Sequence, residues 1–176
     1  MFRAVRIALF IFAALAEFSP LAQVTEESFD RQFAVNTKGA FFAMQRIAPL
    51  IRDGGSITAV TVTPGTATPS MSVYMATKAA VRAFSQVLAA ELLGRNVRVN
   101  CLAPGFIDTP TLGVAGLTTE ERRALAEIGD LATPMKRHGT VDEIAAAALF
   151  LGFDATFTTG IELPVDGGIS TVDSPQ

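Results

Sequence analysis

The chain has 176 residues, of which 49% are hydrophobic and 18% charged, and its formal net charge is −3. This composition indicates one compact domain over residues 1–176, with flexible ends expected at 1–6 and 171–176. The absence of any Lys/Arg run leaves no electrostatic basis for binding nucleic acid, and one cysteine and one histidine offer little material for a disulfide, a metal site or a Ser-His-Asp triad.

The first apolar run, residues 7–15, allows two interpretations. It follows a basic start and ends near the small residues Ala14 and Ala16, which is typical of a secretory signal peptide, although it is too short to span a bilayer. The alternative is a buried strand within Ile7–Ala13. We favour the strand and therefore expect a cytoplasmic protein without a membrane segment, with export as the alternative.

The next elements alternate between helical and strand patterns. Thr25 is a predicted N-cap, and apolar residues at helical spacing predict a long helix over Glu26–Arg52, bent near Gly39. The β-branched run Ser56–Val62 predicts a buried strand that Pro64-Gly65 ends. Later elements are a helix over Ser72–Leu93, a strand over Val97–Leu102, helices that open with capping boxes at Thr118 and Thr140 and extend to about Ile128 and Leu151, and a last strand over Gly160–Val165. Such alternation predicts a parallel sheet covered by helices.

Tyr74 and Lys78 stand four residues apart in the helix predicted over Ser72–Leu93, so their side chains share one face. An ammonium held close to a phenol favours the phenolate and lowers its pKa, so such a pair can act as an acid and base near neutral pH. Taken alone, the spacing also fits a packed tyrosine and a solvated lysine.

Four blocks together make the chemical interpretation stronger. They are Asn36 within Val35-Asn36-Thr37-Lys38-Gly39, the Tyr74/Lys78 helix, Arg98–Gly105, and Asp166-Gly167-Gly168. Their order and spacing resemble the short-chain dehydrogenase/reductase family, and the resemblance covers residues 16–170. It implies an α/β fold, a partial Rossmann-like doubly wound parallel sheet in three α/β/α layers. The segment Ala16–Leu21 also resembles the loop after the family's fourth strand, which favours the strand interpretation of residues 7–13.

The resemblance also implies catalytic roles. Tyr74 would exchange a proton with the substrate oxygen, Lys78 would lower the pKa of Tyr74 and bond the nicotinamide ribose, and Asn36 would hold a water that relays protons from Lys78. Thr61, with Thr63 nearby, stands where the family has a serine that orients the substrate oxygen. A threonine hydroxyl can donate the same bond, but its methyl group crowds the site.

The cofactor would be NAD or NADP, held by Tyr74 and Lys78 together with a loop after the strand that ends near Leu102. The residues of this loop that match the family's cofactor-contacting segment are Pro104, Gly105, Ile107 and Thr109. The segment Pro110–Met135 would cover the substrate. None of the 14 glycines forms the family's Gly-x-x-x-Gly-x-Gly turn, which normally binds the pyrophosphate, so the chain looks like a member lacking its first third.

Three functional hypotheses follow. The first is an NAD(P)-dependent oxidoreductase acting on a small alcohol or ketone, impaired by the missing glycine-rich portion. The second is a non-catalytic remnant or dimer-partner subunit, and the third is a secreted protein of unknown role. The apolar surfaces of the helices over Glu26–Arg52 and Ser72–Leu93 further predict a homodimer or homotetramer, and no metal site is expected.

Overall fold

The computed structural model describes residues 7–63, 65, 67–110 and 118–172. At its centre lies a four-stranded sheet in the order β1-β2-β3-β4, and every neighbouring pair is parallel. The strands are β1 (Ala8–Ile11), β2 (Ser56–Val60), β3 (Arg98–Pro104) and β4 (Glu162–Val165). Because the strands are parallel, their carboxyl ends meet at one edge of the sheet, where ligands bind in open α/β sheets.

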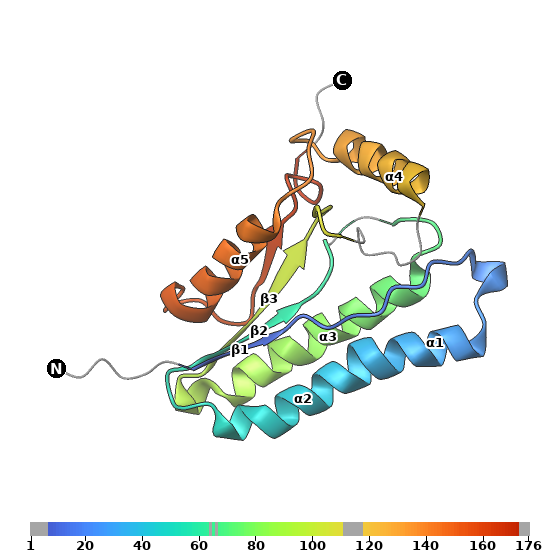
Figure 1. Ribbon diagram of the computed structural model, residues 1–176. Coiled ribbons are helices and arrows are strands. Elements are labelled where there is room, and N and C mark those ends of the chain that lie inside the picture. Colours follow the sequence, from blue (N-terminus) through green and yellow to red (C-terminus); the bar gives the residue numbers. More distant parts are fainter. Residues whose placement is uncertain (1–6, 64, 66, 111–117, 173–176) are drawn as a thin grey trace.

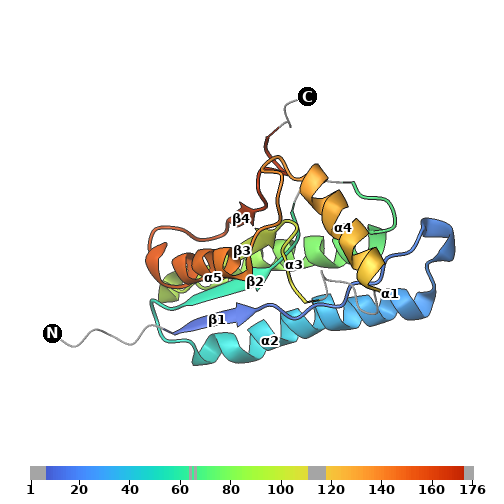
Figure 2. The same ribbon diagram turned by 45° about the horizontal axis from the view of Figure 1, so that its top comes forward.

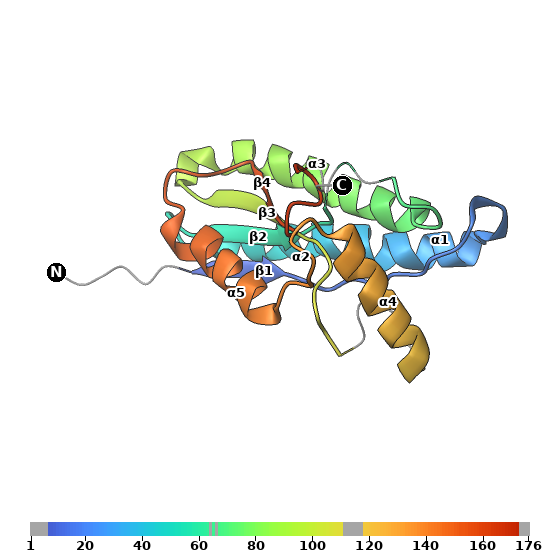
Figure 3. The same cartoon turned by 90° about the horizontal axis from the view of Figure 1, so that it is seen from above.

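Helices cover both faces of this sheet (Figure 1, Figure 3). On one face lie α1 (Glu26–Gln32), α2 (Ala40–Ile47) and α3 (Ser72–Glu91), and on the other lies α5 (Val141–Leu149). The helix α4 (Thr119–Ala132) stands beyond the carboxyl ends of the strands (Figure 2). This arrangement confirms the α/β class and the three layers predicted from the sequence.

A hydrophobic core lies on each face of the sheet, which explains why the strands are apolar on both faces. On the α3 side, a buried stripe at four-residue spacing includes Val81 and Ala89 and packs on Val99 and Cys101 of β3. On the α5 side, the neighbouring strand residue Leu102 packs with Ala148, Leu151 and Ala155. Alternate residues of one strand therefore serve opposite cores, as the period of a strand requires.

The helix predicted over Glu26–Arg52 is divided by a π-helical segment, Phe33–Gly39, between α1 and α2, and a short 3₁₀ turn follows at Ala48–Leu50. Thr25 caps α1, since its hydroxyl accepts a hydrogen bond from the backbone N–H of Ser28. Both predicted capping boxes are also present, at the starts of α4 and α5. The helix α4 continues beyond its predicted end to Ala132, and α5 passes into a π-helical segment at Phe150–Asp154.

The strand predicted within Ile7–Ala13 is confirmed as β1. Several other predictions concern residues outside the described part of the chain: 1–6 of the possible signal sequence, Pro64 as a strand end, 111–117 of the substrate-covering segment, and 173–176 of the flexible end. Thr171 and Val172, also predicted to be flexible, donate backbone hydrogen bonds to the carbonyl of Gly168. Among the helices that the structure describes, none combines the length and the apolar character needed to cross a membrane.

Candidate active site

The predicted pair Tyr74 and Lys78 lies at the carboxyl end of β2. Lys78 is only 2% exposed, and its Nζ donates a hydrogen bond of 3.1 Å to the carbonyl of Val60, the last residue of β2. The same nitrogen lies 5.8 Å from the centroid of the half-buried Tyr74 ring. One helical turn of α3 therefore brings a phenol and an ammonium together at the edge of the sheet where ligands bind.

Burial governs the ionisation of both groups. It raises the pKa of Tyr74 above its ordinary value of 10.0 and lowers the pKa of Lys78 to about 8. The sequence predicted the opposite direction for Tyr74, with the ammonium lowering its pKa. The difference arises because burial disfavours the charged phenolate of Tyr74, a cost that the helical spacing does not reveal. At neutral pH Tyr74 is therefore a neutral phenol and most Lys78 is protonated.

Asn36 is 1% exposed and holds the loop that follows β1. Its Oδ1 accepts a hydrogen bond from the N–H of Leu15, and its Nδ2 donates to the carbonyl of Leu15, both at 2.7 Å. The same Nδ2 donates to the hydroxyl of Thr77 at 3.1 Å. These bonds show that the side-chain amide of Asn36 fixes the loop, and the water relay expected at Asn36 stays a prediction. Asn36 lies in the π-helical segment, which is a common placement at functional sites.

The hydroxyl of Thr61 points to a buried carboxylate. Its Oγ1 lies 2.6 Å from Oε1 of Glu162 on β4, whose other oxygen lies 3.4 Å from Nε of Arg82 on α3. The hydroxyl of Thr63 donates to the carbonyl of Pro104 at 2.9 Å. The sequence assigned Thr61 to orienting a substrate oxygen, but its proton is directed to Glu162, because a carboxylate is a stronger acceptor than the neighbouring carbonyls.

The loop after β3 carries the other predicted cofactor residues. Pro104 ends the strand, and Gly105 lies so close to the residue after β4 that a side chain at Gly105 would meet the backbone of Asp166 at 2.7 Å. Ile107 forms a β-bridge with Gly139, which lies in the segment that precedes α5. Thr109 is half-buried at the end of this described segment. The loop is therefore anchored at its start and middle, at the same sheet edge as Tyr74.

A loop residue without an assigned role contacts the tyrosine directly. The ring of Phe18, in the loop after β1, packs edge-to-face on Tyr74, with ring centroids 6.0 Å apart and an interplanar angle of 80°. Phe18 remains 42% exposed. The neighbouring N–H of Ser19 donates to the carbonyl of Ser70 at 2.9 Å, just before α3.

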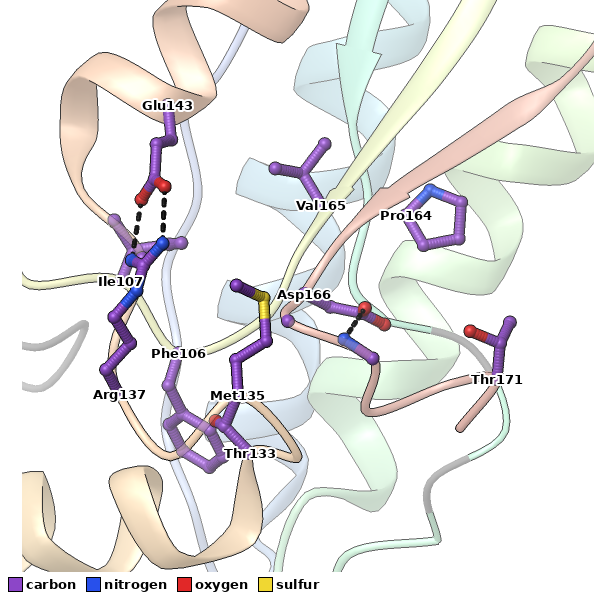
Figure 4. A pocket seen from close by; sticks show the side chains of 13 residues that line it. Phe106, Ile107, Thr133, Met135, Arg137, Glu143, Pro164, Val165, Asp166 and Thr171 are labelled. Atoms are coloured by element: carbon purple, nitrogen blue, oxygen red, sulfur yellow. Dashed lines mark hydrogen bonds and ion pairs between the residues drawn. The ribbon is translucent and has the colours of Figure 1, made fainter. Parts of the chain in front are cut away.

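A cavity of about 450 Å³ has neither Tyr74 nor Lys78 among its lining residues, and Figure 4 shows it from close by. It is enclosed by the loop after β3, the segment between α4 and α5, and the turn after β4, with Phe106, Ile107, Met135, Arg137, Asp166 and Thr171 among its lining residues. Arg137 is bonded to Glu143, and Asp166 accepts a hydrogen bond from the N–H of Gly168. Of the predicted site residues, only Ile107 reaches the cavity. Within the described residues, no group of His, Cys, Asp and Glu side chains is placed to hold a metal ion.

Sequence reasoning missed Phe18, Arg82 and Glu162. Arg82 had a local signal, because it follows Lys78 by one further helical step. Glu162 had a weaker one, as a lone charge within the last predicted strand. Phe18 had none, since its contact with Tyr74 depends on how two distant loops meet.

Comparison with known proteins identifies what the chain resembles. Residues 7–170 match the family model described as enoyl-(acyl carrier protein) reductase. A curated relative, L-fucose dehydrogenase of Mus musculus, is 38% identical over 159 residues, which are 87% of this chain and 58% of that protein. The chain thus spans about three fifths of the length of this relative.

Two solved structures have the same arrangement of elements. Levodione reductase superposes with a TM-score of 0.84 and 30% identity, covering 94% of this chain and 67% of that one. An angucycline C-6 ketoreductase with bound NADP superposes with a TM-score of 0.80 and 29% identity, covering 92% of this chain and 62% of that one.

Proposed function

The chain belongs to the short-chain dehydrogenase/reductase family, and from that membership we propose that it carries the catalytic residues of an NAD(P)-dependent oxidoreductase acting on an alcohol or ketone. The single observation that carries the proposal is the pairing of Tyr74 with the buried Lys78 at the carboxyl end of β2. The NADP in the related ketoreductase supports the choice of cofactor.

The ionisation of the pair favours ketone reduction at neutral pH. Because its pKa is raised, Tyr74 is protonated and can donate its proton to a carbonyl oxygen. A nicotinamide dinucleotide, when bound, supplies the hydride that the carbonyl carbon accepts, so the ketone is reduced to an alcohol as the dinucleotide is oxidised. The phenolate left on Tyr74 lies near the ammonium of Lys78, which stabilises it until a proton from solvent restores the phenol.

The residues present fit the nicotinamide half of such a cofactor. Tyr74 and Lys78 stand on one side of the sheet edge, and the anchored loop with Pro104, Gly105, Ile107 and Thr109 stands at the end of the adjacent strand β3. Lys78 uses one N–H on Val60 and retains two others for a ribose hydroxyl. The pyrophosphate half has no glycine-rich turn among these 176 residues.

Activity assays test the proposal. We would follow oxidation of NADH and NADPH with a panel of ketones, using the 176-residue chain and a form extended at its N-terminus by a βαβ segment with a glycine-rich turn. We expect slow or no turnover by the chain alone and measurable turnover by the extended form. Tyr74→Phe should lower the rate of the extended form by about 10²- to 10⁴-fold, since only the proton donor is removed. Retention of most of the rate would overturn the assignment, and binding of dinucleotide without any turnover would favour a non-catalytic partner subunit.

We also propose that the chain self-associates through its α1–α3 side, as a homodimer or homotetramer. A hollow of about 340 Å³ on this side is lined by aromatic rings from the π-helical segment, α2 and α3: Phe33, Phe41, Phe42 and Phe84. Phe41 and Phe42 are about 40% exposed, and a second copy would remove these rings from water.

A further inference from the structure

Hydrogen bonds on both sides of Phe18 hold its loop in place. Glu17, the residue before it, receives hydrogen bonds from Arg31 at 2.7 Å and Ser28 at 2.6 Å, and its N–H donates to Gln32. Asn36 fixes the start of this loop through Leu15, and Ser19 bonds the carbonyl of Ser70. The loop is thus tied to α1, to the π-helical segment and to the residues before α3.

The loop anchored in this way leaves 42% of Phe18 exposed next to Tyr74. Exposed apolar surface next to a reactive group is a feature of ligand sites, where an apolar part of the ligand covers it. The ring centroids of Phe18 and Tyr74 are 6.0 Å apart, so a substituent of a few carbon atoms, on a substrate whose oxygen bonds the Tyr74 hydroxyl, is long enough to contact the exposed part of the Phe18 ring.

We propose that Phe18 determines substrate specificity by forming an apolar platform beside Tyr74, which selects ketones and alcohols with a ring or another bulky apolar substituent next to the reacting carbon. This inference rests on the proposed function for the position of the substrate oxygen. The ionised groups of this loop do not disfavour an apolar substituent at Phe18, because the carboxylate of Glu17 is neutralised by the guanidinium of Arg31 at 2.7 Å. A small polyhydroxy ketone would gain no comparable contact, since it has no apolar surface to place on the ring.

The test uses the fact that Tyr74 is the only tyrosine of the chain. Protein with ¹³C-labelled tyrosine gives ring signals from Tyr74 alone, so their shifts report binding at this position without cofactor or turnover. We would titrate the 176-residue chain with acetophenone, cyclohexanone and dihydroxyacetone. We expect acetophenone and cyclohexanone to bind at least about tenfold more tightly than dihydroxyacetone.

Variants separate the platform from the fold. Phe18→Ser should lower the affinity for acetophenone and cyclohexanone, relative to dihydroxyacetone, by about tenfold. Phe18→Leu should keep the relative affinity for cyclohexanone and lower the relative affinity for acetophenone. The matched control is Phe157→Ser, which removes a fully exposed ring elsewhere and should leave all three affinities unchanged.

Equal affinities for the three ketones in the unmodified chain, or the same preference in Phe18→Ser, would overturn the proposal. A preference that depends on Phe18 in a protein whose extended form shows no turnover would instead overturn the proposed function and leave the platform standing. If the extended form turns over ketones and Phe18→Ser does not change which ketones it prefers, the proposed function stands and the platform is overturned.

Discussion

The hydroxyl of Thr61 and the carboxylate of Glu162 form a hydrogen bond of 2.6 Å between residues 101 positions apart in the chain. Thr61 follows β2 and Glu162 begins β4, so the bond reaches past the intervening strand β3. Arg82 adds a cation from α3 at 3.4 Å. This contact joins the strand end that carries the Lys78 bond to the far edge of the sheet.

Thr61→Val should destabilise the fold by about 1–3 kcal/mol, because the nearly buried carboxylate of Glu162 loses a charge-assisted donor. Thr61→Ser keeps the hydroxyl and should cost less. Urea unfolding of both variants provides the measurement. If the valine variant is as stable as the serine variant, the bond contributes nothing to the fold.

The sole tyrosine allows its acidity to be measured directly. We expect the tyrosinate absorbance of the folded chain to appear with a midpoint above pH 10.0, because burial disfavours the phenolate of Tyr74. Tyr74→Phe serves as the blank and should show no such transition. A midpoint below the ordinary value would mean that the ammonium of Lys78 dominates, as the sequence alone suggested.

The buried Lys78 should make stability depend on pH. Its pKa of about 8 in the folded chain lies below its ordinary value of 10.5, so between these values the unfolded chain binds a proton that the folded chain lacks, and stability rises with pH. This contribution is lost as the pH falls through about 8. From about pH 8 to pH 9.5, wild type should gain on the order of 2 kcal/mol relative to Lys78→Met. Urea unfolding at both pH values measures the difference. Burial raises the pKa of Cys101 to about 11, and this thiol interacts electrostatically with Lys78, so both proteins are compared in a Cys101→Ala background, where that interaction is absent. Parallel pH profiles would contradict the prediction.

Self-association should depend on the aromatic hollow between α2 and α3. Phe41→Ser should lower the association constant by about tenfold or more, because the ring packs on both Phe42 and Phe84 and no longer contributes apolar area. Light scattering over a concentration series measures the effect, with Phe157→Ser as the control at a distant exposed ring. A wild-type chain that is monomeric at micromolar concentration would refute the proposed assembly.

Local patterns predicted those parts of the molecule that depend on local geometry. The four-residue step from Tyr74 to Lys78 defines a shared helix face, and the β-branched run that follows Gly55 predicts β2. The ionisation of Tyr74 was predicted in the wrong direction because spacing reveals proximity but not desolvation. The partner of Thr61 could not be predicted either, since the position of Glu162 depends on the register between β3 and β4.

The continuous winding of α3 makes the site sensitive to chain length at some positions and not at others. Tyr74, Lys78 and Arg82 follow one another in steps of four on a helix without interruption from Ser72 to Glu91. One inserted residue between the first two would turn everything downstream by about 100°, and the amine and guanidinium would leave the sheet edge together. Natural or engineered insertions and deletions should therefore be excluded from this stretch and accumulate in surface segments such as the exposed turn at Phe157, where the same change rotates no functional side chain.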